Sequence, residues 1–147
     1  MMIIQKSLCA ADLEIAYLEV GPDGGQPVVC FHGFPDCARS YAEVMLALAD
    51  RGYKVVVPFL RGFSPTRFLD ESTPRAGDMA ALGQDALDFF DALALRDAIV
   101  VGQDWGSSIA EILTFSRQSR VSKLVKLNWY GVYPMAESAK LRDFDYA

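Results

Sequence analysis

The stretch Val101–Gly106 reads Val-Gly-Gln-Asp-Trp-Gly and continues the apolar run that begins at Ala98. The pattern predicts a strand over residues 97–102, a sharp turn with Asp104 at its apex, and then the start of a helix. Only small neighbours let a strand and a helix approach each other so closely, which explains the glycines at 102 and 106. This stretch therefore predicts a fold in which parallel strands alternate with helices.

Asp104 is the candidate reactive group of this turn. A carboxylate at the apex cannot act as a serine-type acylating group, but it can attack carbon and form an ester with a substrate. The alternative is a helix N-cap, a position where Asp is common. The motif Gly-x-Asp-x-Gly alone does not decide between the two interpretations.

A second motif, His32–Pro35, favours the catalytic interpretation. It follows an earlier apolar strand at 27–31. An oxyanion hole in this architecture takes one backbone N–H from the residue after the nucleophile and one from the loop after such a strand. Trp105 and Phe34 occupy these two positions, so we expect both N–H groups beside Asp104.

The fold class follows from apolar runs that are continuous rather than alternating. Such runs are typical of strands covered by helices on both faces, as in a parallel sheet. With 147 residues, 52 % of them hydrophobic, the chain is expected to form one domain. We predict an α/β fold with a mostly parallel sheet. The expected strands are 2–9 and 13–20 as a hairpin, then 27–31, 54–59, 97–102 and 123–129, with helices near 41–48, 79–93 and after Asp104.

Composition excludes several functions. The net charge is −5 and the basic residues are dispersed, which argues against nucleic-acid binding. No apolar run reaches the roughly 20 residues of a membrane span, and the start of the chain lacks a signal-peptide pattern. The three cysteines lack metal-ligand spacing, so we expect neither a metal nor a cofactor, and a reducing cytoplasm.

Residues 1 to about 134 resemble the N-terminal half of an α/β-hydrolase-fold enzyme, with the epoxide hydrolases and haloalkane dehalogenases as the nearest groups. The matching segments are His32–Pro35, Pro58–Gly62 and Val101–Gly106. The resemblance implies that Asp104 opens an epoxide or displaces a halide, and that a water activated by a distant His then cleaves the ester. It also implies structural roles for motif residues His32, Gly33, Pro35, Gly102 and Gly106.

Two departures refine the expectation. His-Gly-Phe-Pro resembles the epoxide hydrolase loop, whereas dehalogenases usually carry a polar residue at position 34 to hold the halide; Trp105 suits either group. The family's Pro-Asp-x-Arg-Gly loop has Phe59 in place of Asp here. We therefore expect Arg61 to be structural and Gly62 to be a turn residue.

The resemblance also implies an acidic partner, a base His and a helical cap bearing tyrosines. The chain contains a single His, His32, which we expect to brace its loop rather than act as the base. Asp36 and Asp85 are weak candidates for the acidic partner. Residues 1–134 are expected to form the N-terminal part of the hydrolase core without a cap domain, and 135–147 the start of a cap or a disordered tail.

The resulting prediction is a hydrolase that acts on a small apolar electrophile through a covalent Asp104 ester, most similar to epoxide hydrolases. Alternatives are a haloalkane dehalogenase and a non-catalytic fragment or binding module without the catalytic His. We expect the isolated chain to be inactive, and a partial version of a longer enzyme is the simplest account. The strand at 123–129 would be a sheet edge, so we also expect association, as a homo-oligomer or with the missing C-terminal half.

Overall fold

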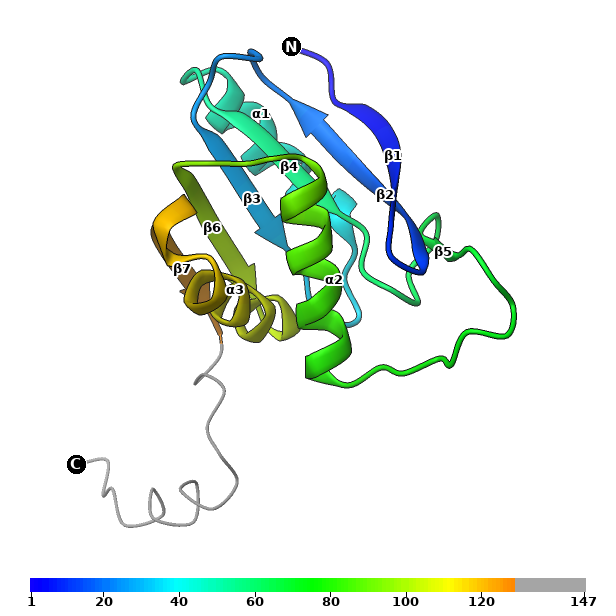
Figure 1. The fold of residues 1–147 in the computed structure, drawn as a ribbon. Coiled ribbons are helices and arrows are strands. Elements are labelled where there is room, and N and C mark those ends of the chain that lie inside the picture. Colours follow the sequence, from blue (N-terminus) through cyan, green and yellow to red (C-terminus); the bar gives the residue numbers. More distant parts are fainter. Residues whose placement is uncertain (129–147) are drawn as a thin grey trace, which may run out of the picture.

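The structure, a computed structural model, describes residues 1–128 and contains one sheet with helices on both faces (Figure 1). The strands are β1 (Ile4–Ala10), β2 (Leu13–Val20), β3 (Pro27–Phe31), β4 (Lys54–Pro58), β5 (Arg67–Phe68), β6 (Ala98–Gln103) and β7 (Val121–Leu127). The helices are η1 (Ala38–Tyr41), α1 (Ala42–Ala49), α2 (Met79–Ala92), α3 (Trp105–Ser116) and η2 (Gln118–Arg120).

The sheet has the order β1-β2-β4-β3-β6-β7, and the short β5 pairs with β2. β1 and β2 form the predicted antiparallel hairpin, and β2 also runs antiparallel to β4. The pairs β3–β4, β3–β6 and β6–β7 are parallel. The expected α/β fold with a mostly parallel sheet is therefore confirmed.

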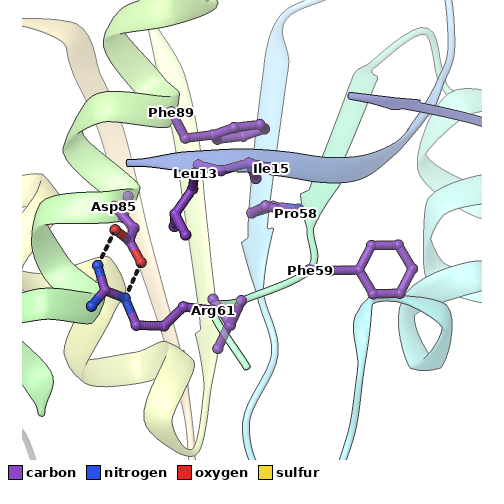
Figure 2. A pocket seen from close by; sticks show the side chains of 9 residues that line it. Leu13, Ile15, Pro58, Phe59, Arg61, Asp85 and Phe89 are labelled. Carbon is purple, nitrogen blue, oxygen red and sulfur yellow. Dashed lines mark hydrogen bonds and ion pairs between the residues drawn. The ribbon is translucent and has the colours of Figure 1, made fainter. Parts of the chain in front are cut away.

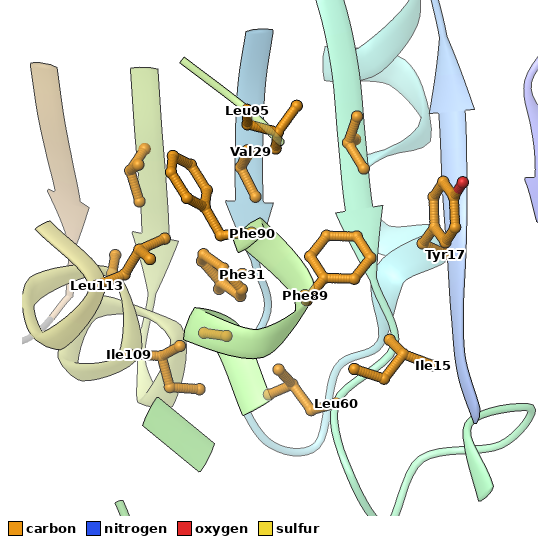
Figure 3. Packing of buried hydrophobic residues seen from close by; sticks show 14 of the residues in the cluster. Ile15, Tyr17, Val29, Phe31, Leu60, Phe89, Phe90, Leu95, Ile109 and Leu113 are labelled. Atoms are coloured by element: carbon orange, nitrogen blue, oxygen red, sulfur yellow. The ribbon is translucent and has the colours of Figure 1, made fainter. Parts of the chain in front are cut away.

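Two hydrophobic cores lie on opposite faces of the sheet. Under α2 and α3, aromatic side chains such as Phe31, Phe89 and Phe90 fill one core (Figure 3). On the other face, Met45 and Ala49 of α1 pack against the remaining sides of β2, β3 and β4. Because both faces are covered, the strands need apolar residues at successive positions, which accounts for the continuous runs in the sequence.

Local signals account for the helix boundaries. The Asp78 side chain accepts a hydrogen bond from the N–H of Ala81 and so caps the N-terminus of α2. After α1, Gly52 has a φ of +88° and its N–H donates to the carbonyl of Ala49. A glycine in this conformation just after the last helical residue is a common C-terminal signal, and Gly52 follows the end of the helical spacing in the sequence.

Some expectations need correction. The recurrence of Tyr41, Val44, Met45 and Leu48 at helical spacing predicts that Val44 faces the core, but Val44 is exposed and Ala49 is buried instead. The polar, proline-containing sequence of residues 61–75 predicts a loop, but this segment contains β5, since Arg67 and Phe68 pair with the start of β2. The last strand begins at Val121 and ends at Leu127 rather than spanning 123–129. Trp129 and the expected boundary at 134 lie outside the described residues.

The topology brings the two sequence motifs together. β3 and β6 are adjacent and parallel, with Phe31 opposite Gly102. Their carboxyl ends therefore lie at the same edge of the sheet, where sites in open α/β folds occur. The segment His32–Pro35, named here the 32–35 loop, leaves β3 at this edge beside Asp104.

Candidate active site

Asp104 lies on a strained turn between β6 and α3. Its backbone has φ +54° and ψ −122°, which is unusual for a residue other than glycine. The turn is fixed from both sides, because the Asp104 N–H donates to the carbonyl of Leu127 (3.1 Å) and its carbonyl accepts from the N–H of Ser107 (2.9 Å). Strain held in this way occurs at functional sites.

The side chain of Asp104 does not cap the helix that it precedes. It makes no capping hydrogen bond to the first turn of α3. Its Oδ1 instead accepts the backbone N–H of Phe34 at 3.1 Å, across 70 positions of sequence. The predicted proximity of the two motifs is therefore confirmed. Within residues 1–128 the Trp105 N–H is not bonded to this carboxylate, and its role as a second donor stays a prediction.

Glycines allow this close approach. A Cβ on Gly33 would lie 2.4 Å from both Cβ and Oδ1 of Asp104. A Cβ on Gly106 would lie 1.9 Å from the carbonyl oxygen of Phe31, and one on Gly102 would lie 2.1 Å from the carbonyl oxygen of Gly106. These distances are shorter than non-bonded contacts allow, so a larger residue would push the 32–35 loop away from the Asp104 turn.

His32, the first residue of the 32–35 loop, is fully buried, and both of its ring nitrogens are hydrogen-bonded. Nε2 accepts the backbone N–H of Leu60 at 3.2 Å, which places the proton on Nδ1, and Nδ1 then donates to the carbonyl of Gly33 at 3.0 Å. Burial lowers the pKa of His32 below its ordinary value. The imidazole is thus a neutral brace, with no nitrogen left to activate water.

This brace directs the donor that holds Asp104. The carbonyl of Gly33 and the N–H of Phe34 belong to one peptide group, whose C=O and N–H point in opposite directions when it is trans. His32 binds the carbonyl end, so the N–H end points toward Oδ1 of Asp104. A hydrogen bond at one end of a peptide also polarises the other end.

An aromatic pair lies next to the carboxylate. The rings of Phe34 and Trp105 stack, with centroids 5.5 Å apart and an interplanar angle of 23°. Phe34 is 62 % exposed, which is unusual for so large an apolar side chain. The side chain at position 34 offers no N–H to a halide ion, but it offers an apolar surface to a substrate.

The other acidic candidates are engaged elsewhere. Asp36 accepts a hydrogen bond from Ser40 at 3.0 Å, within its own turn. Asp85, on α2, forms a bidentate ion pair with Arg61. The predicted structural role of Arg61 is thus supported, and Gly62, with φ +81°, is the predicted turn residue.

The sequence patterns do not predict two further features of this region. One is the Arg61–Asp85 pair, whose members are 24 positions apart and joined only by the tertiary fold. The other is Ser107, which is buried and bonds the carbonyls of Gly102 (2.8 Å) and Leu127 (2.9 Å). Ser107 thereby ties α3 to both neighbouring strands. Its position in the first helical turn after a strand is the signal that could have suggested this role.

Two classes of feature are not found in the described part of the chain. Residues 1–128 contain no group of three or more His, Cys, Asp or Glu side chains placed to hold a metal ion. None of the helices in the same range is both long and apolar enough to cross a membrane.

Comparison with known proteins identifies relatives. Residues 26–146 match the family described as alpha/beta hydrolase fold. The chain is 34 % identical to a haloalkane dehalogenase of Mycolicibacterium paratuberculosis over 85 % of its own length and 40 % of that protein. It is 32 % identical to epoxide hydrolase 2 of Siraitia grosvenorii over 76 % of its length and 35 % of that protein.

Comparison with solved structures gives relatives of the same kind. A Klebsiella pneumoniae protein, named as a candidate epoxide hydrolase, superposes with a TM-score of 0.83 and 41 % identity, covering 93 % of this chain and 48 % of that one. Potato epoxide hydrolase I gives a TM-score of 0.79 with 29 % identity, over 95 % of this chain and 46 % of that one. The chain thus spans less than half the length of each of these four relatives.

Proposed function

Because the chain belongs to the alpha/beta hydrolase fold family, we propose that Asp104 is the nucleophile of a hydrolase that opens epoxides through a covalent ester. The observation that carries the proposal is the hydrogen bond from the Phe34 N–H to Asp104 Oδ1 at 3.1 Å. This bond supports a catalytic role, because the Asp104 carboxylate binds the 32–35 loop and does not cap α3.

In the first step, the second carboxylate oxygen, Oδ2, attacks an epoxide carbon. Within the described residues Oδ2 has no hydrogen-bond partner, while Oδ1 is held by Phe34. The new bond joins Oδ2 to the substrate carbon as the ring C–O bond breaks. The ring oxygen leaves with the electron pair and takes a proton from solvent or from a group outside residues 1–128.

In the second step, water attacks Cγ of the ester and negative charge develops on Oδ1. The Phe34 N–H already points at this oxygen, and the Trp105 N–H is the proposed second donor. The N-terminus of α3 adds a favourable dipole. The bond from Cγ to the substrate-bearing oxygen then breaks and the diol leaves. Activating the water needs a base, and His32 cannot supply it because both nitrogens are engaged. The chain alone therefore forms the ester but does not cleave it.

The stacked rings of Phe34 and Trp105 support a small apolar substrate. They also favour an epoxide over a haloalkane, because Phe34 cannot donate a hydrogen bond to a departing halide. Haloalkane dehalogenase is nevertheless the second candidate, since one relative with 34 % identity carries that name. In that case the Trp105 indole N–H would be one of the halide donors.

The test is to incubate the chain separately with styrene oxide and with 1-bromohexane and to follow intact mass. The proposal predicts one Asp104-dependent adduct that forms faster with styrene oxide and is lost in Asp104→Asn. An adduct formed preferentially with 1-bromohexane, with stoichiometric bromide release, would support the dehalogenase. If neither compound gives an Asp104-dependent adduct, the chain is a non-catalytic module and the proposal is wrong.

A further inference from the structure

The Arg61–Asp85 ion pair lies near the candidate active site but makes no contact with Asp104. Arg61 Nε and Nη2 bond Oδ2 and Oδ1 of Asp85, both at 2.6 Å, and each side chain is 14 % exposed (Figure 2). Arg61 Nη1 also donates to the carbonyl of Ala76 at 2.9 Å. Two parallel charge-assisted bonds fix a guanidinium in orientation as well as in position. The pair thus anchors the segment after β4 to α2.

The anchored segment holds His32 from two sides. Leu60, directly before Arg61, donates its N–H to His32 Nε2 at 3.2 Å. Phe63 packs its ring edge-on against the imidazole, with centroids 4.8 Å apart, and its N–H closes a turn onto the carbonyl of Leu60 at 3.0 Å. Residues 60–63, the 60–63 turn, therefore hold His32, and Arg61 lies within this turn.

The residue before Leu60, Phe59, is held by contacts that do not involve Asp85. The N–H of Phe59 donates to the carbonyl of Ala16 at 2.8 Å, and its carbonyl accepts the hydroxyl of Thr66 at 2.7 Å. Beyond Phe59, the N–H of Thr66 also holds the Phe63 carbonyl at 3.1 Å, and the ion pair is the contact that ties the turn to α2. A change at Asp85 is therefore expected to displace the 60–63 turn without separating β4 from the sheet.

We infer that Asp85 and Arg61 are positioning residues for Asp104, acting through the 60–63 turn, His32 and the Gly33–Phe34 peptide. The ion pair fixes the turn, the turn holds the imidazole, and the imidazole orients the peptide whose N–H meets Oδ1. The inference rests on the proposed function in that the oriented N–H matters chemically only if Asp104 forms an ester.

The primary variant is Asp85→Asn, which keeps the size of the side chain but removes its charge. The matched control is Asp91→Asn, also on α2, whose carboxylate pairs with Arg117 and Arg120 near the C-terminal end of the helix. Arg61→Lys is a second variant that keeps the charge but cannot make two parallel bonds. Comparing the three separates an effect on the site from a general loss of stability.

The first readout is the decay of the Asp104 ester in neutral hydroxylamine, a nucleophile that attacks Cγ without base activation, leaves a hydroxamate on Asp104 and releases the diol. The ester is formed with styrene oxide and its loss followed by intact mass. Complete loss of an oxyanion donor slows enzymes by about 100-fold or more. A displaced donor is expected to cost less, so we predict about tenfold slower decay in Asp85→Asn, a smaller effect in Arg61→Lys and wild-type decay in Asp91→Asn.

The second readout is the NMR titration of His32, the only histidine of the chain. Loss of the Leu60 N–H bond to neutral Nε2 is expected to raise the pKa of His32 in Asp85→Asn and in Arg61→Lys. Removing the Asp85 charge alone would lower that pKa, so an upward shift identifies the displaced turn. Asp91→Asn is expected to leave it unchanged.

An unchanged His32 titration in a folded Asp85→Asn protein would overturn the inference, as would equal slowing of ester decay by Asp91→Asn. If the wild-type chain forms no ester, the proposed function fails. The titration then still decides whether the ion pair positions His32, so the two failures can be told apart.

Discussion

The Gly33–Phe34 peptide group determines how Asp104 is held. One end is bound by His32 and the other donates to Oδ1 of the carboxylate. The geometry distinguishes the two oxygens of Asp104, since Oδ1 is held by the Phe34 N–H and Oδ2 has no hydrogen-bond partner among the described residues. A single peptide thus fixes the orientation of the carboxylate, and under the proposed function Oδ2 would be the attacking atom.

Gly33→Ala tests how closely this peptide must approach Asp104. The new Cβ would lie 2.4 Å from Oδ1, so the loop must move. We expect loss of esterification and a decrease of about 1–3 kcal/mol in the free energy of unfolding, as for other overpacked sites. Gly24→Ala is the control, because no atom lies within 4 Å of its Cβ. Urea unfolding measures the free energy of unfolding, and intact mass measures the extent of esterification. A Gly33→Ala protein that is esterified as the wild type is would contradict the prediction.

The neutral state of His32 predicts a pH dependence of stability. Burial depresses the pKa of the folded imidazole below 6.5, so the unfolded chain binds the proton more readily. This contribution to stability is present above about pH 6.5 and is lost as the pH falls through the folded pKa. NMR titration of the single His in native buffer and in urea measures both pKa values. A folded value at or above the unfolded value would contradict the prediction.

At single positions, the sequence was sufficient to predict that Asp104 and Phe34 meet, because both follow adjacent parallel strands. The sequence was not sufficient to predict the hydrogen bond from the Leu60 N–H to His32 Nε2, because Leu60 lies in the loop after another strand, β4. Nor did the pattern reveal that Asp104 leaves the helix uncapped. Such hydrogen bonds depend on side-chain directions that only the assembled fold determines.

Among the secondary-structure elements, α3 is the one that joins the candidate site to the last strand. Ser107, in its first turn, bonds the carbonyls of Gly102 on β6 and Leu127 on β7, and it accepts the N–H of Leu127 at 3.3 Å. The Asp104 N–H reaches the same Leu127 carbonyl. The end of β7 therefore supports the strained turn.

Ser107→Ala should weaken this junction. It removes the hydroxyl that bonds the Gly102 carbonyl in the buried part of this junction and that accepts the Leu127 N–H, which costs about 1–3 kcal/mol in the free energy of unfolding. The control is Ser116→Ala at the exposed end of α3, expected to stay within about 0.5 kcal/mol of the wild type. Equal stability of the two variants in urea unfolding would show that the Ser107 hydroxyl does not support the turn.

Elements with strong patterns were predictable, and weakly patterned ones were not. The strand at 27–31 and the helix that starts at Met79 match their predictions closely, because apolar spacing and an N-cap mark them. The two-residue β5 carries no such pattern and exists only because β2 offers an edge to it. The Arg61–Asp85 pair was likewise hidden, since residues 24 positions apart are joined by packing rather than periodicity.

At the scale of the whole described sheet, residues 1–128 leave one face partly open beside β7. β7 is the last strand of the described sheet, and its Val125 and Leu127 are 42 % and 47 % exposed. In the strand register, Val125 lies beside Val101 of β6 and Leu127 lies beside Gln103. These residues belong to the face of the sheet that α1 covers, but α1 packs over β2, β3 and β4 and not over β7. An apolar sheet face with an unpaired edge favours association.

We therefore predict that the chain associates through β7, and that Val125→Lys with Leu127→Lys reduces association. The matched control places lysines at Val44 and Leu69, which are 49 % and 47 % exposed but lie away from this edge. Sedimentation velocity measures the outcome. A wild-type chain that sediments as a monomer would show that the open face is tolerated in water, and equal effects of both double variants would point to general solubility.

Peptide mapping of the styrene oxide adduct tests most directly whether Asp104 is the nucleophile that the epoxide alkylates. Mapping matters because Cys9 and Cys37, both at least partly accessible, can also react with an epoxide. We expect one adduct per chain on Asp104, linked as an ester, with no protein-dependent diol until hydroxylamine is added and one equivalent released afterwards. An adduct confined to the cysteines, stable to hydroxylamine and unchanged in Asp104→Asn, would contradict it.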